Sequence, residues 1–86
     1  MQNATYPKPE TPMDSAVTAF KLGELDRKAG QSEGYIKASR MAYLIGRTWP
    51  GIEAPASLKR SNEDRHVGMV DGLEAAALDN DADRKA

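Results

Sequence analysis

Few residues in this chain have the types and spacing that catalysis or metal binding requires. His66 is the only histidine in 86 residues, and cysteine is absent. A metal site that uses one histidine needs carboxylate partners, but Glu63 and Asp64 fall on other sides of the helix that the local pattern predicts. We therefore expect His66 at the edge of the core, with one ring nitrogen in water.

The acidic run 79–83 begins with the residue spacing of a calcium-binding loop. Such a loop needs glycine at its sixth position, where this chain has Arg84. We expect a solvated acidic tail instead. Because no nucleophile motif or phosphate-binding glycine loop occurs either, the sequence predicts a protein that is not an enzyme and that uses no metal or cofactor.

The clearest chemical signal is a basic stripe in the segment 32–51. Three basic residues and a leucine follow one another at spacings of three, four and three, which places them on one side of a helix: Lys37, Arg40, Leu44 and Arg47. Two aromatic residues lie close to them in the sequence. The pattern predicts a partner-binding surface formed by Lys37, Arg40, Tyr43, Arg47 and Trp49.

Three interpretations of this stripe are open. Arginine and tryptophan are common anchors in protein interfaces, whereas basic residues beside aromatic ones can also contact phosphates and stack on bases. The stripe can equally be an ordinary solvated helix face, with Trp49 in the core. A protein partner is favoured over nucleic acid, because three basic residues on a slightly acidic chain attract a polyanion weakly.

Charge is distributed unevenly along the chain. The 12 basic and 13 acidic residues give a net charge of −1. Residues 31–60 carry five basic and two acidic side chains, whereas residues 61–86 carry three basic and seven acidic ones. These two parts could attract each other within one molecule or between copies, so a homo-oligomer is an open alternative.

The composition is that of a small cytoplasmic protein. No apolar run approaches the roughly 18 residues of a membrane-spanning helix, and the first residues lack the basic and apolar regions of a signal peptide. The absence of cysteine excludes a disulfide framework and fits a reducing compartment. We expect a cytoplasmic protein without membrane contact.

Three helices are predicted from capping and turn signals. Ser32 can cap the second helix, Gly30 suits the left-handed position after the first, and Pro50-Gly51 marks a turn. No segment alternates apolar and polar residues, so we expect no sheet. The predicted helices span residues 14–29, 33–47 and 61–78.

Small residues predict where two of these helices touch. Ala38, Ala42 and Gly46 recur every four residues on the second helix, and Gly68 and Gly72 repeat this interval on the third. Backbones can approach where side chains are small, so we expect Ala42 and Gly72 to meet. The expected core comprises Phe20, Leu25, Ile36, Tyr43, Ile45, Val70 and Leu73.

The fold class that follows is all-α, a small bundle of about three helices. Prolines predict an extended or disordered arm over residues 1–12, followed by a helical domain over 13–78. Residues 79–86 are expected to form a frayed acidic tail, because acids at a helix C-terminus oppose its dipole. A domain this small has a thin stability margin, which a partner or a second copy often supplements.

The predicted function is that of a non-catalytic binding protein that engages a larger protein or assembly. Such chains act as regulators, inhibitors or accessory subunits, and some are encoded by phages and other mobile elements. Two alternatives are open. One is a binder of nucleic acids or nucleotide phosphates that uses the basic stripe, and the other is a self-assembling structural subunit.

Overall fold

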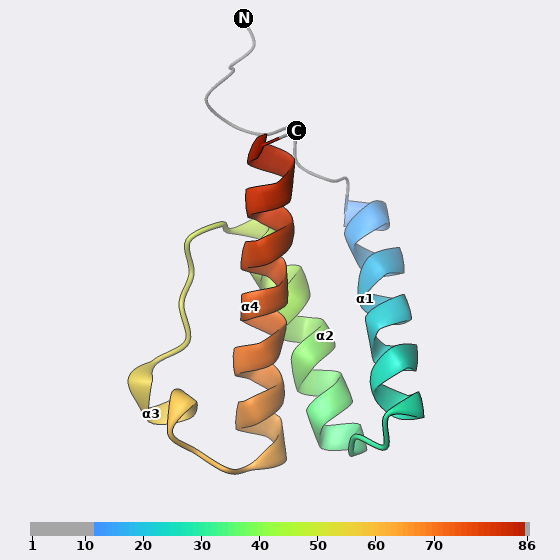
Figure 1. Cartoon of the computed structure of the whole chain (residues 1–86), viewed down its shortest axis with the longest axis vertical. Helices are drawn as coiled ribbons and strands as arrows, with labels where there is room; N and C mark the ends of the chain where they lie inside the picture. Colours follow the sequence, from blue (N-terminus) through green and yellow to red (C-terminus); the bar gives the residue numbers. More distant parts are fainter. Residues whose placement is uncertain (1–11, 86) are drawn as a thin grey trace, which may run out of the picture.

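A computed structural model describes residues 12–85, which form an all-α bundle (Figure 1). The predicted fold class is confirmed, and the described residues contain no strand. A short helix between the second and third predicted ones was not expected, and residues 1–11 of the predicted arm lie outside the described residues. The helices are α1 (Pro12–Lys28), α2 (Glu33–Thr48), α3 (Ala56–Lys59) and α4 (Asp64–Lys85).

α1 and α2 form an antiparallel hairpin (Figure 1). Gly30 adopts a φ of 87°, a left-handed conformation that glycine takes at little cost. The Gln31 amide then donates to the Asp26 carbonyl at 3.0 Å, as in a Schellman cap. The Ser32 hydroxyl accepts from the Tyr35 amide at 3.1 Å and caps α2. Both predicted signals are confirmed.

α2 and α4 run in the same direction and share the most extensive contact of the fold (Figure 1). A parallel pair needs a return connection, which residues 49–63 provide. It starts with the predicted turn at Pro50-Gly51, where Gly51 has a φ of 97° and the order Pro-Gly is that of a type II turn. The connection then contacts α4 through α3.

Glycines let α2 and α4 approach until backbone meets backbone. A Cβ atom on Gly68 would collide with the Tyr35 carbonyl, and one on Gly72 would collide with the Ser39 carbonyl. The predicted meeting of Gly72 and Ala42 is confirmed, because a Cβ on Gly72 would lie 2.9 Å from that of Ala42. The small-residue stripes of the two helices therefore set their separation.

The core is thinner than predicted. Ile36, Tyr43 and Leu73 are buried and Val70 is partly buried, but three expected core residues are exposed: Phe20, Leu25 and Ile45. The reason is that α1 faces α2 with buried small residues spaced by four, namely Ser15, Ala19 and Gly23. Three large apolar side chains of α1 are consequently exposed, Val17, Phe20 and Leu25, while Leu22 is partly buried against the core.

α4 continues well beyond the predicted end at residue 78. It ends at Lys85, so residues 79–85 are helical where a frayed tail was expected. Asp79 and Asp83 oppose the helix dipole, but both accept hydrogen bonds from side chains of α2. These contacts offset the unfavourable dipole interaction, and they could not be inferred from α4 alone.

Candidate protein-binding surface

The predicted basic stripe does not form one surface, because its residues face different neighbours. Arg47 lies against α4 with 3% of its side chain exposed. Its Nη1 donates to Asn80 Oδ1 at 2.8 Å, and its Nη2 donates to Asp83 Oδ2 at 2.7 Å. Arg47 is thus used inside the molecule, and its predicted position on an exposed stripe is wrong.

Tyr43 is also removed from the predicted surface. It is fully buried, and its hydroxyl donates to Asp79 Oδ2 at 2.6 Å. The same arrangement recurs two turns earlier, where the Tyr35 hydroxyl donates to Asp71. A ladder of polar bonds therefore joins α2 to α4, and the basic middle of the chain meets the acidic end within one molecule.

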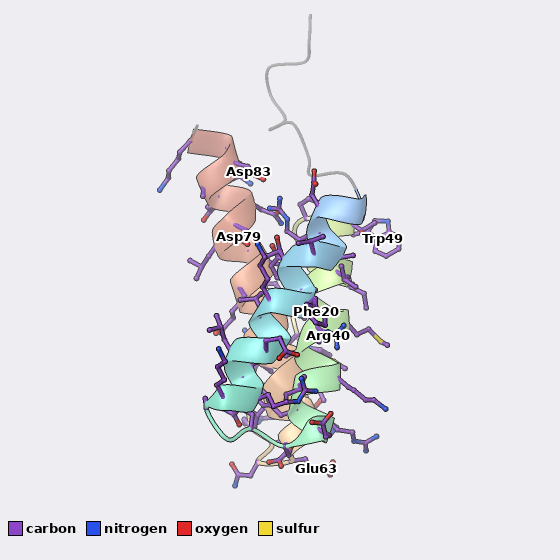
Figure 2. The ribbon with its side chains drawn as sticks, turned by 90° about the vertical axis from the view of Figure 1, so that its right-hand side faces the viewer. Phe20, Arg40, Trp49, Glu63, Asp79 and Asp83 are labelled. Carbon is purple, nitrogen blue, oxygen red and sulfur yellow. The ribbon has the colours of Figure 1, made fainter. Side chains whose placement is uncertain are left out.

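The other three predicted residues remain at the surface. Arg40 is partly buried, and its guanidinium lies 5.6 Å from the centroid of the Phe20 ring, within the range of a cation–π contact. Lys37 is exposed. Trp49 is 60% exposed and projects away from the bundle at the end of α2, while Phe20 and Arg40 lie between α1 and α2 (Figure 2). Trp49 is therefore a surface residue.

Groups on α1 and α2 have shifted pKa values. Burial, with a smaller effect of the Asp71 charge, raises the pKa of Asp26. Burial and the hydrogen bond to Asp71 also raise the pKa of Tyr35, whose hydroxyl stays protonated and donates. At the hairpin, the hydrogen bond from Arg27 lowers the pKa of Glu33, with Nη2 and Oε1 3.2 Å apart.

His66 lies at the edge of the core, as predicted. Its ring is partly buried, and Nδ1 lies 2.8 Å from the Ser61 hydroxyl. The same hydroxyl accepts from the Glu63 amide at 3.1 Å. His66 therefore helps to fix the segment that leads into α4.

An apolar groove that the sequence interpretation missed opens where α2, the return connection and α4 meet. Its volume is about 220 Å³. Glu53 is the one charged residue in its lining. The groove is lined by Ala38, Met41, Ala42, Ile45, Ile52, Glu53, Pro55, Met69 and Leu73.

Large apolar side chains at this groove are open to solvent. Met41 is 64% exposed, Ile52 44% and Ile45 37%. Together with Trp49, Met41 and Ile45 form what we call the outward face of α2. Contiguous exposed apolar surface of this kind marks interaction sites, and methionine adapts readily to different partners.

The sequence indicates only some of the residues that form this surface. Met41, Ile45 and Trp49 recur every four residues, which indicates one helix face, but the same spacing is typical of a core. Ile52 and Pro55 reach the groove only because the connection returns alongside the helices, and no local pattern indicates such a path.

Two further properties concern the described residues, 12–85. Within this range, no group of three His, Cys, Asp or Glu side chains could hold a metal ion, and no helix is both long and apolar enough to cross a membrane. Comparison of the chain with protein-family models, curated proteins and solved structures finds no significant match.

Proposed function

We propose that this chain is a non-catalytic protein-binding module whose contact surface is the apolar groove together with the outward face of α2. The groove carries the proposal, since every lining residue except Glu53 is apolar. Grooves of this kind receive the apolar side chains of a partner, often from an amphipathic helix. The module would act as a regulator, inhibitor or accessory subunit of the assembly that it joins.

The size of the groove favours a protein over a small-molecule ligand. Its volume of about 220 Å³ lies below the roughly 300–1,000 Å³ of typical ligand pockets. A few apolar side chains would fill it. The exposed outward face of α2 beside it would then contact the rest of the partner's surface, as the rim of a protein interface does.

Charge favours protein over nucleic acid as the partner. Arg47 is paired with Asp83, and Arg40 lies over Phe20. Arg40 is also partly buried, which leaves Lys37 as the exposed basic residue of the stripe. Binding to a nucleic acid backbone relies on several phosphate contacts, which one exposed lysine does not supply.

The proposal is tested by affinity capture from cells of the natural source that co-express tagged and untagged copies of the chain. We expect Met41→Glu to reduce capture of the bound protein at least ten-fold, because a carboxylate would enter the apolar surface. Leu78→Glu is the matched control, since Leu78 is 70% exposed and lies outside the groove lining. If Met41→Glu captured as much of the bound protein as the wild type does, the proposal would be contradicted.

Nucleic acid is tested in parallel with DNA and RNA oligomers. The nucleic acid alternative would be favoured if an oligomer bound the chain, if Lys37→Glu or Arg40→Glu weakened that binding, and if Met41→Glu left it unchanged. We expect no such binding at physiological salt.

A further inference from the structure

We infer that the occupant of this surface is a second copy of the same chain, packed antiparallel through α2. The inference rests on the proposed function, because it names the partner of the same surface. Among the side chains of residues 14–85, nine large apolar ones are exposed and four are buried: Tyr35, Ile36, Tyr43 and Leu73. A chain with so little buried apolar surface is stabilised when a second copy covers part of the remainder.

Four exposed residues form a ridge along α2 and its end: Lys37, Met41, Ile45 and Trp49. Their spacing of four is that of the ridges along which two helices pack against each other. α1 and α4 both contact α2, yet they leave these four side chains exposed. The ridge is therefore open to a helix that carries the same spacing, and α2 of a second copy carries it.

The ridge is self-complementary in the antiparallel orientation. If Met41 faces Ile45 of the second copy, Lys37 faces Trp49 of that copy, and two-fold symmetry repeats both contacts. A lysine ammonium beside an indole ring makes a favourable cation–π contact. The dipoles of the two α2 helices also oppose each other, which is weakly favourable.

A parallel pair would be disfavoured by charge. It would place the two Lys37 side chains next to each other, and like charges juxtaposed in an interface repel. The antiparallel pair separates them by about 18 Å, the rise of a helix between positions 37 and 49. The ridge of the second copy would at the same time cover the groove, of which Met41 and Ile45 form one wall.

The oligomeric state is measured by sedimentation or light scattering of the full chain. We expect twice the chain mass of 9.4 kDa, a self-affinity at least ten-fold weaker for Met41→Glu, and no change for Leu78→Glu. Circular dichroism of each variant establishes that it is folded. A wild-type chain that is monomeric at all concentrations, or a dimer that Met41→Glu leaves intact, would overturn the inference.

The orientation is measured by disulfide crosslinking, which the absence of cysteine from the chain makes specific. Lys37→Cys and Trp49→Cys are oxidised separately and as an equal mixture. We expect a crosslinked dimer from the mixture and little from either variant alone. The mixed dimer keeps one of its two Lys37–Trp49 contacts. A crosslink from Lys37→Cys alone would mean a parallel pair and would overturn the inference.

The two levels of the proposal fail in distinguishable ways. A monomeric chain whose capture of another protein depends on Met41 would overturn the second copy as occupant and leave the proposed function standing. If Met41→Glu changed neither self-association nor the capture of another protein, both the proposed function and the second copy as occupant would be overturned.

Discussion

On the side of α2 that faces α4, small residues let the two backbones approach, and polar side chains form hydrogen bonds between the two helices. The pairs are Tyr35–Asp71, Tyr43–Asp79 and Arg47–Asp83. On the outward side of the same helix, Met41, Ile45 and Trp49 are exposed and apolar. One face of α2 therefore has its interactions satisfied within the molecule, while the other has surface left for contact.

The difference shows how one helix can fix a fold and still offer a contact surface. The three polar pairs all join residues 36 positions apart, so sliding α4 by one turn would break all of them at once. Polar pairs between helices specify register in this way. No polar pair fixes the register of the outward face, and the flexible side chain of Met41 lets this face adapt to the shape of its occupant.

The largest effect is expected from reversing the charge of Arg47. Arg47→Glu would remove a buried cation and place a carboxylate beside Asp83, and we expect a loss of about 3 kcal/mol or more in the free energy of unfolding. Lys37→Glu is the control on the exposed side and, at a concentration where the chain is monomeric, should change stability by less than about 0.5 kcal/mol. Chemical denaturation measures both. Equal effects of the two changes would mean that the faces do not differ.

A smaller loss is expected from filling the closest contact between α2 and α4. Gly72→Ala would drive a Cβ into the Ser39 carbonyl, and overpacking of this kind costs roughly 1–3 kcal/mol. This would outweigh the gain of up to about 1 kcal/mol that alanine brings to a helix. In Gly34→Ala the new Cβ would lie 3.3 Å from Cγ of the exposed Arg65 side chain. That variant should be neutral or more stable in thermal unfolding.

The smallest effect concerns Asp26 and depends on pH. Its pKa is raised in the folded state, by burial first and by Asp71 second. The folded state therefore favours the protonated carboxyl, and stability is lost as pH rises through the raised pKa. Asp26→Asn should unfold at a slightly higher temperature than the wild type at pH 7, and this difference should shrink towards pH 3. A difference that grows on acidification would contradict the assignment.

Local signals in the sequence were sufficient to predict the helices and one contact between them. Ser32, Gly30 and Pro50-Gly51 act on their immediate neighbours, so their caps and turns were predictable. The meeting of Ala42 with Gly72 followed from matching four-residue intervals. The end of α4 was not predictable, because Asp79 and Asp83 are stabilised by residues of another helix.

The candidate surface was harder to predict than the fold. The spacing alone places Arg47 and Lys37 on one side of a helix. It does not show that α4 covers Arg47 and leaves Lys37 in water. Tyr43 and Met41 are both large, and only the position of α4 determines which is buried. The groove needed the parallel arrangement of α2 and α4, which brings the return connection to its edge.

The most direct test uses two adjacent residues on the two faces of α2, since Met41 is 64% exposed and Ala42 is 2% exposed. Each is replaced by glutamate, and thermal unfolding and self-association are measured. We predict that Met41→Glu loses association and, at a concentration where the wild type is monomeric, keeps the wild-type melting temperature, because dimerisation itself raises that temperature. Ala42→Glu should lose several kcal/mol of stability, about the cost of forcing a charge into the interior. A destabilised Met41→Glu, a stable Ala42→Glu, or a Met41→Glu protein that associates like the wild type would contradict the assignment of the two faces.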